Sequence, residues 1–214
     1  MVLSAENLTM KYHDGENERT ILQDISVKFK DKNCYVLVGP SGSGKSTLLY
    51  LLSTLRNPTE GMIKLNDEII SYSKKAESIR YEKFGFIFQQ AFLLPYLTAK
   101  ENICMAKKDR DISLKADNWL EKFNMSNLSQ KYPHQLSGGE KQRIAIIRAL
   151  IKNPCVIFAD EPTASLDREN ARLVFDVLKK EASYSILIMA THDLSLLTGD
   201  EKVYKIADQK ITMI

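Results

Sequence analysis

A run of eight residues, Gly39 to Ser46, has the residue types and spacing needed to bind phosphate. It matches the pattern G-x-x-x-x-G-K-[ST] and follows the apolar run Tyr35 to Val38. Glycines let the backbone curl until successive N–H groups point at phosphate oxygens, Lys45 adds a mobile cation, and Ser46 offers Mg²⁺ a hydroxyl. The pattern alone leaves open a kinase, a GTPase, a helicase or a transport motor. The residues expected to contact the nucleotide are Gly39, Pro40, Ser41, Gly42, Ser43, Gly44, Lys45, Ser46 and Thr47.

Two consecutive carboxylates, Asp160 and Glu161, follow the apolar run Val156 to Ala159. A carboxylate at the end of a buried strand can reach the Mg²⁺ shell beside a phosphate loop, so we assign Asp160 to the metal. Glu161 lies where it can polarise a water molecule for in-line attack on the γ phosphate. Taken alone, the pair is also compatible with an acidic cap between strand and loop. With the phosphate loop, it predicts nucleotide hydrolysis.

A second loop suited to an anion has the sequence Leu136-Ser137-Gly138-Gly139-Glu140. The pattern that follows predicts a helix over Lys141 to Ile151. A hydroxyl and two glycine amides therefore stand at a helix amino end, where the helix dipole favours negative charge. One chain thus has two loops that favour phosphate.

Short β-rich runs alternate with helical segments along the chain, which predicts an α/β fold with a parallel sheet. The runs that end at Val38 and Ala159 deliver the residues described above, and a third, Ile186 to Ala190, ends in Thr191-His192-Asp193. Buried parallel strands present ligands at their carboxyl ends in this way. The segment Thr47 to Leu55 is predicted to be the helix that follows the phosphate loop.

Two regions are expected to flank this core within a single domain, residues 1–214. The segment from Leu3 to about Leu37 mixes short alternating stretches with turn signals such as His13-Asp14-Gly15, which predicts an antiparallel β-subdomain. A small helical subdomain is predicted at about 90–137, with helices over Thr98 to Met105 and Leu114 to Phe123. The face formed by Trp119, Leu120 and Phe123 is interpreted as core packing rather than a ligand site.

Composition narrows the class of protein. The 214 residues suit one domain, and 30 basic against 27 acidic residues leave a net charge of +3, too balanced to argue for nucleic acid. Cys34, Cys104 and Cys155 are far apart and lack CxxC spacing, so we expect free thiols rather than disulfides or a zinc site. The start of the chain lacks the features of a signal peptide, and no apolar stretch is long enough to span a membrane. We expect a soluble protein whose membrane role requires a partner.

Together, the two phosphate-seeking loops and Asp160-Glu161 resemble the ABC ATPase family over essentially the whole chain. The second loop is similar to the LSGGQ signature of that family, with Glu140 as a variant in the last place. In the family, the signature loop of one protomer closes on ATP held by the phosphate loop of the other. The resemblance therefore implies a homodimer with ATP and Mg²⁺ at the interface, and it places a set of residues at the partner's nucleotide: Ser137, Gly138, Gly139 and Glu140.

The remaining family positions are also filled. Gln89 matches the Q-loop glutamine that touches Mg²⁺ and the attacking water, and Asp167 matches the D-loop across the dimer. His192 matches the switch histidine that senses the γ phosphate, and Tyr12 matches the aromatic residue that stacks on adenine. The resemblance thus implies catalytic roles for Glu161, His192 and Gln89, and metal roles for Ser46, Gln89 and Asp160.

Two departures from the family pattern are visible. Lys32-Asn33 stands where many relatives have Gly-Glu, and Ile147 occupies a helix position where alanine is frequent. We interpret both as matters of turn geometry and packing.

The resemblance also indicates a cellular role. The segments Phe92 to Ala99 and Tyr132 to Leu136 look most like the macrolide-export and lipoprotein-release branch, a look that some bacteriocin-export ATPases share. The implied protein is a peripheral ATPase at the cytoplasmic face of the membrane that powers export or extraction through an integral-membrane permease. The stretch Phe92 to Leu97 is compatible with a docking lip for the permease and equally with a hydrophobic core segment. One alternative is a regulator that docks on a permease-like protein. The other is an ABC ATPase acting on DNA or ribosomes, although the coiled-coil insertions and tandem units of those classes are missing.

Overall fold

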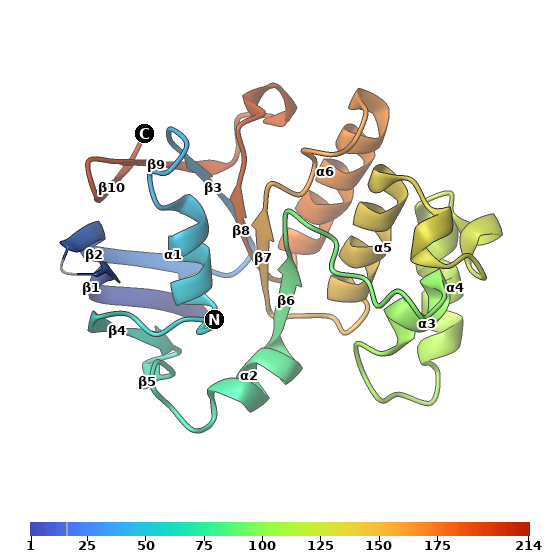
Figure 1. Cartoon of the computed structure of the whole chain (residues 1–214), viewed down its shortest axis with the longest axis horizontal. Coiled ribbons are helices and arrows are strands. Elements are labelled where there is room, and N and C mark those ends of the chain that lie inside the picture. The colour runs from blue at the N-terminus through green and yellow to red at the C-terminus, as the bar shows by residue number, and fades with distance from the viewer. Residues whose placement is uncertain (16) are drawn as a thin grey trace.

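A six-stranded sheet delivers most of the predicted site residues. In the computed structural model, which describes residues 1–15 and 17–214, its strand order is β10-β9-β3-β8-β7-β6 (Figure 1). The predicted parallel core is confirmed, because every pairing in this sheet is parallel except that of β10 with β9. The strands are β3 (Asn33–Val38), β6 (Phe84–Ile87), β7 (Val156–Asp160), β8 (Ile186–Ala190), β9 (Lys202–Ala207) and β10 (Lys210–Met213).

A second, antiparallel sheet has the order β2-β1-β4-β5. Its strands are β1 (Val2–Asp14), β2 (Asn17–Lys30), β4 (Glu60–Leu65) and β5 (Glu68–Ile69). The predicted antiparallel region therefore exists, but its range was wrong at the end, since 33–37 belongs to the parallel sheet. Strands β4 and β5 complete the sheet from beyond the phosphate loop. In the predicted turn, His13 and Asp14 still belong to β1, Gly15 has a left-handed backbone, and the next residue lies outside the described part of the chain.

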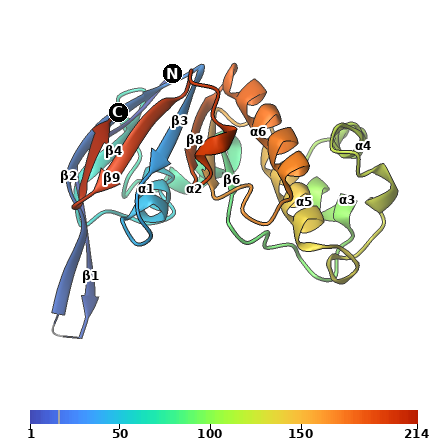
Figure 2. The ribbon, with the colours of Figure 1, turned by 90° about the horizontal axis from the view of Figure 1, so that it is seen from above.

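Helix α1 (Lys45–Leu52) lies between the two sheets, and α5 (Gly138–Leu150) and α6 (Arg168–Ala182) cover the other face of the parallel sheet (Figure 2). Helix α2 (Ala76–Lys83) leads into β6. The predicted starts of α1 and α5 were too late by two and three residues, because Gly44 and Ser137 occupy the N-cap positions. Both loops that favour phosphate therefore lead directly into a helix amino end.

The central parallel strands β3, β7 and β8 bury both of their faces. In β3, Cys34 and Val36 belong to a core shared with α5 and α6, whereas Tyr35 and Leu37 belong to a core shared with α1 and the antiparallel sheet. This is why the strands read as continuous apolar runs rather than as alternating ones. Rigid strands packed on both faces fix the position of the residues at their carboxyl ends.

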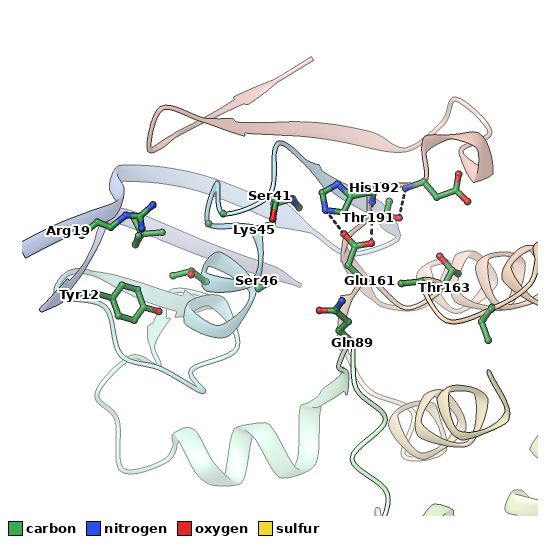
Figure 3. A pocket seen from close by; sticks show the side chains of 17 residues that line it. Tyr12, Arg19, Ser41, Lys45, Ser46, Gln89, Glu161, Thr163, Thr191 and His192 are labelled. Carbon is green, nitrogen blue, oxygen red and sulfur yellow. Dashed lines mark hydrogen bonds and ion pairs between the residues drawn. The ribbon is translucent and has the colours of Figure 1, made fainter. Parts of the chain in front are cut away.

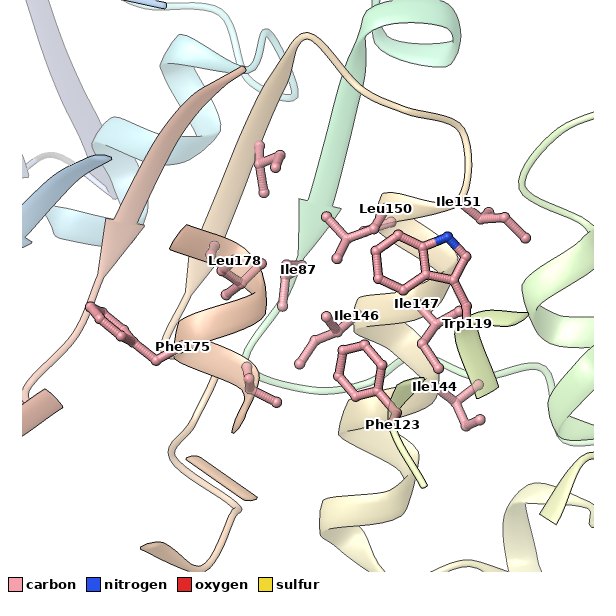
Figure 4. Packing of buried hydrophobic residues seen from close by; sticks show 14 of the residues in the cluster. Ile87, Trp119, Phe123, Ile144, Ile146, Ile147, Leu150, Ile151, Phe175 and Leu178 are labelled. Carbon is pink, nitrogen blue, oxygen red and sulfur yellow. The ribbon is translucent and has the colours of Figure 1, made fainter. Parts of the chain in front are cut away.

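The predicted helical segments between the Gln89 region and α5 are present as α3 (Ala99–Cys104) and α4 (Ile112–Lys122), with 3₁₀ turns at Ser126–Leu128 and Pro133–Gln135. Trp119, Leu120 and Phe123 are buried in the same core as the isoleucines of α5. Figure 4 shows Trp119 and Phe123 beside Ile144, Ile146 and Ile147. The predicted core role of these aromatic residues is thereby confirmed. A further 3₁₀ turn, Leu194–Leu196, follows β8.

The two departures from the family pattern have simple structural settings. Lys32 has φ 58°, a left-handed conformation that favours glycine. Ile147 lies on α5, and its side chain is fully buried in the core that this helix covers. The three cysteines are free, and burial raises the pKa of the Cys34 thiol to about 12, which makes it unreactive. Across residues 1–15 and 17–214, no helix combines the length and apolarity that a membrane crossing requires.

Candidate nucleotide site

A cleft of about 730 Å³ lies at the carboxyl ends of β3, β7 and β8. Figure 3 shows Tyr12 and Arg19 at one end of it and Gln89, Glu161 and His192 at the other, with the phosphate loop between them. This arrangement of residues along the cleft suits an elongated ligand with a ring at one end and phosphates at the other. The predicted residues that line it are Tyr12, Ser41, Gly42, Gly44, Lys45, Ser46, Thr47, Gln89, Glu161 and His192.

The phosphate loop is shaped by glycines with left-handed backbones. Gly42 and Gly44 have φ 76° and 102°, and the space around the Cα of Gly42 is open. A Cβ at Gly39 would lie 2.3 Å from the carbonyl oxygen of Ile206, so only glycine fits where β3 gives way to the loop. Pro40 and Ser43 face a neighbouring hollow, formed with β2 and the turn between β9 and β10, rather than the main cleft.

Lys45 is buried at the floor of this loop. Its Nζ donates hydrogen bonds to the carbonyl oxygens of Gly39 at 2.9 Å and Pro40 at 3.1 Å. An ammonium group has three donors, so these bonds leave capacity for a phosphate oxygen. The structure therefore holds the cation beneath the place where a phosphate would sit.

Ser46 lines the cleft and meets Asp160, the last residue of β7, which is not part of the cleft lining. The hydroxyl of Ser46 donates a 2.9 Å hydrogen bond to Oδ1 of Asp160, which is 5% exposed. A hydroxyl and a carboxylate are oxygen ligands of the kind that Mg²⁺ prefers, and the side chain of Gln89 lines the same cleft. In the described residues, no cluster of three or more histidine, cysteine or acidic side chains could enclose a metal. The residues thus fit a cation that draws its other ligands from phosphates and water.

Glu161 faces His192 across the cleft. Its backbone has φ 47°, and its N–H donates to the carbonyl oxygen of Ala190, which ties the end of β7 to the end of β8. Oε2 accepts a 3.2 Å hydrogen bond from the backbone N–H of His192. Oε1 lies 3.2 Å from His192 Nε2, within ion-pair distance, and accepts no hydrogen bond from the described residues. The carboxylate is thus oriented by one oxygen, while its other oxygen is buried beside the imidazole and accepts no hydrogen bond.

Tyr12 stands between two arginines. Arg19 is its partner in the pairing of β1 with β2 and lines the cleft, while the guanidinium of Arg56 lies 4.8 Å from the centre of the Tyr12 ring. Tyr12 lines the cleft and Arg56 does not, so Arg56 contacts the ring from outside the cleft. The position is suited to stacking a flat aromatic base.

The second predicted loop lies away from this cleft. Ser137 caps α5 in a reciprocal pair, because its Oγ accepts from the N–H of Glu140 while Glu140 Oε2 accepts from the N–H of Ser137. The backbone hydrogen bond from Ser137 lowers the pKa of Glu140. Asp167 likewise caps α6 by accepting from the N–H of Asn170, which lowers its pKa. Within the one chain, Ser137, Gly138, Gly139, Glu140 and Asp167 are not brought to the phosphate loop.

Several cleft residues were missed by the sequence analysis. Arg19 could have been found from the alternation in β2, because it shares a strand face with Ile21 and pairs with Tyr12. Thr191 and Asp193 flank His192 and were quoted only as its neighbours. The stretch after Glu161 gave no signal of its own. The missed residues are Arg19, Ile21, Thr163, Ala164, Leu166, Thr191 and Asp193.

Residues 22–164 match the family model described as ABC transporter. The chain is 36% identical to the lipoprotein-releasing system ATP-binding protein LolD of Pseudoalteromonas translucida, over all of this chain and 96% of the relative. It is 38% identical to the putative hemin import ATP-binding protein HrtA of Staphylococcus haemolyticus, over the full length of both.

Solved structures agree with these sequence relatives. The dimeric structure of MJ0796, a bacterial ABC transporter cassette, superposes with a TM-score of 0.92 at 31% identity, covering 98% of this chain and 96% of the other. The same cassette in a post-hydrolysis state bound to ADP and Pi gives a TM-score of 0.90 at 30% identity, with the same coverage.

Proposed function

This chain belongs to the ABC transporter family and is an ATP-hydrolysing subunit of that family, and on this premise we propose that MgATP occupies the cleft between Tyr12 and His192. The observation that carries the proposal is the Glu161 carboxylate. It lies at the end of β7, one residue beyond the Ser46–Asp160 pair, and holds one oxygen free of hydrogen bonds in a cleft of ATP size.

We assign the work of hydrolysis to positioning and charge stabilisation, as in other phosphoryl transfers. Lys45 and the N–H groups of the phosphate loop bind the β and γ phosphates. Glu161 accepts a proton from the attacking water. Gln89 and His192 orient the water and the γ phosphate from either side of Glu161.

Ser46, Asp160 and Gln89 would hold the magnesium ion. When bound, this ion neutralises charge on the phosphate oxygens.

The loop Ser137 to Gly139 serves a second copy of the chain in this proposal. It lies at an exposed helix amino end and has no phosphate loop facing it within the chain. The structural relative is described as dimeric. We therefore propose a homodimer in which Ser137, Gly138, Gly139 and Glu140 cover the nucleotide of the partner, with Asp167 at the same interface.

A permease is the proposed membrane partner. Residues 90–137 would form a helical subdomain inserted into the single domain 1–214, and this subdomain would receive the cytoplasmic face of the permease. Phe92 and Tyr96 are 62% and 71% exposed on its surface, which supports a docking lip at this point. The chain would then act as a peripheral protein at the cytoplasmic face of the membrane.

The cargo would be moved outward or extracted from the membrane. Relatives named for lipoprotein release support this direction, whereas others are named for putative hemin import, so the direction needs its own test. Vesicles holding the chain with its permease should export or release cargo only with ATP. Regulation without transport is the second candidate, and such a protein would bind its membrane partner but move no cargo.

The membrane partnership is tested by purification from detergent-solubilised membranes. We expect the chain to be recovered with an integral-membrane protein. Recovery with ribosomes or DNA instead would refute the proposal. Tyr96→Asp should reduce transport while leaving ATP binding intact, and Tyr184→Asp provides a control because Tyr184 is equally exposed but lies outside the helical subdomain. Normal transport by Tyr96→Asp would show that the exposed surface around Phe92 and Tyr96 does not dock the permease.

A further inference from the structure

Helix α5 holds the backbone on both sides of Gln89 and Gln90. On one side, Nε2 of Gln142 donates a 2.9 Å hydrogen bond to the carbonyl oxygen of Phe88. On the other side, Arg148 donates through Nη2 to Ala91 O at 2.8 Å and through Nη1 to Phe92 O at 2.9 Å. The polar segment that reaches into the cleft is therefore bracketed by two side chains of one helix, beside which it runs in Figure 1.

Both side chains are committed to these contacts. Gln142 is 2% exposed. Burial lowers the pKa of the Arg148 guanidinium, and within residues 1–15 and 17–214 no carboxylate lies within ion-pair distance of it. Burying a cation costs free energy, and hydrogen bonds to two carbonyl oxygens offset part of that cost. The planar guanidinium of Arg148 also fixes the positions of the two carbonyls relative to α5. That geometry includes φ 43° at Phe92, an uncommon conformation for a bulky residue, which needs such a restraint.

The next part of the segment is held in the same manner by α3. Asn102 is fully buried, accepts from the N–H of Leu94 at 2.8 Å, and donates to the carbonyl oxygens of Leu94, Leu97 and Thr98. The backbone from Phe88 to Thr98 is thus fastened to two helices that pack on each other. A displacement of the backbone around Gln89 would therefore strain the hydrogen bonds that join it to α5.

The amino end of α5 is the loop Ser137 to Gly139. We propose that Gln142 and Arg148 are positioning residues that join Gln89, at the chain's own nucleotide, to the loop that covers the nucleotide of a second copy, so that each site of the dimer responds to the occupancy of the other. The proposal rests on the proposed function, since it requires ATP at both sites. Neither side chain touches nucleotide, so both act through the segments that they hold.

The test is steady-state hydrolysis by the purified chain across a range of MgATP concentrations. The wild type is expected to be cooperative, with a Hill coefficient between about 1.5 and 2 for two coupled sites. Arg148→Met and Gln142→Met should bring the coefficient close to about 1, with ATP affinity in a direct titration changed by less than about two-fold. A loss of stability alone would lower the active fraction and leave the shape of the curve unchanged.

Lys152→Met is the matched control. Lys152 lies just beyond the end of α5 and donates to two backbone carbonyls, those of Arg80 and Tyr81 in α2, which lie at the opposite end of β6 from Gln89. This variant should keep the cooperativity of the wild type. Arg148→Lys keeps the charge but replaces the planar fork of the guanidinium by a single nitrogen, so it should hold the two carbonyls less firmly and give an intermediate coefficient. This variant decides the question if Arg148→Met does not fold.

The results expected if the coupling through Gln142 and Arg148 is wrong differ from those expected if the proposed ATPase function is wrong. Cooperative hydrolysis by the Arg148 and Gln142 variants would overturn the inference and leave the proposed function standing. A hyperbolic curve for the wild type, or an equal loss of cooperativity in Lys152→Met, would overturn it as well. A wild type that binds no ATP would instead refute the proposed function.

Discussion

Replacing Glu161 with glutamine removes a proton acceptor while preserving the shape of the site. Oε2 of Glu161 accepts only one hydrogen bond, from the backbone N–H of His192, and an amide oxygen can accept the same bond. The change in the free energy of unfolding should therefore stay within about 1 kcal/mol. The variant should fold, bind ATP and fail at the chemical step.

The expected size of the effect follows from the role of the carboxylate. The side chain of Glu161 is 14% exposed and its Oε1 accepts no hydrogen bond from the described residues, so in our proposal this carboxylate takes the proton. General base catalysis contributes about 10²- to 10⁴-fold, which corresponds to about 2.7–5.4 kcal/mol in the activation free energy. We expect kcat to fall by that factor with little change in ATP affinity.

Two assays on the purified variant check this reasoning. Phosphate release measures kcat, and size-exclusion chromatography with and without MgATP measures the dimer, which should accumulate because trapped ATP is no longer consumed. Glu121→Gln is the control, since it makes the same change at an exposed carboxylate on α4 and should match the wild type. Hydrolysis by Glu161→Gln at the rate of the wild type, without an ATP-dependent dimer, would show that Glu161 is not the base.

Four further substitutions probe the binding groups and the fold. Lys45→Met removes the cation beneath the phosphates and should weaken ATP binding roughly ten- to hundred-fold in a direct titration, so undiminished affinity would contradict the assignment. Tyr12→Leu should weaken ATP binding about three- to ten-fold, because it removes the ring proposed to stack on the base. Arg56→Gln should weaken binding about two- to five-fold in the wild type but not in the Tyr12→Leu background, because Arg56 acts through this ring. Additive effects of the two substitutions would argue against stacking on Tyr12. In Glu201, burial raises the pKa, but hydrogen bonds from Lys179, the backbone and Thr198 outweigh it and lower the pKa to about 2. Since the pKa in the unfolded chain is about 4.3, the stabilisation is present above that pH and is lost as the pH falls toward 2. Thermal unfolding of Glu201→Gln should therefore depend less on pH between about 5 and 2 than that of the wild type, and identical acid dependence would refute this.

The strands and loops of the site could be predicted because each has a local cause. Three apolar runs that end in polar residues read directly as β3, β7 and β8, and the phosphate loop could be placed from its glycines and Lys45. Their convergence at one edge followed from the geometry of parallel sheets. Local patterns were sufficient wherever the neighbours in space were also set by the topology.

Other features depend on contacts between distant segments and left no local pattern. Arg56 reaches Tyr12 because Thr59 bonds to β1 at Thr9 and Lys11, which no periodicity reveals. The hydrogen bonds from Arg148 to the carbonyl oxygens of Ala91 and Phe92 join residues more than fifty positions apart in the chain. Starts of helices were misjudged for a related reason, because the capping hydrogen bonds of Ser137 decide where α5 begins.

The position of the loop Ser137 to Gly139 argues for a second copy from the geometry of one chain. A Cβ at Gly139 would lie 3.1 Å from the side chain of Leu166 and 3.4 Å from the carbonyl oxygen of Ser165, so the loop is braced against the segment that leads into α6. Leu166 also lines the cleft, yet Ser137 does not. Closing the loop onto its own phosphate loop would require α5 to leave the core, where Ile144, Ile146 and Ile147 are fully buried. Because opening that core would cost a large part of the stability of the fold, we propose that the ATP for this loop comes from another chain.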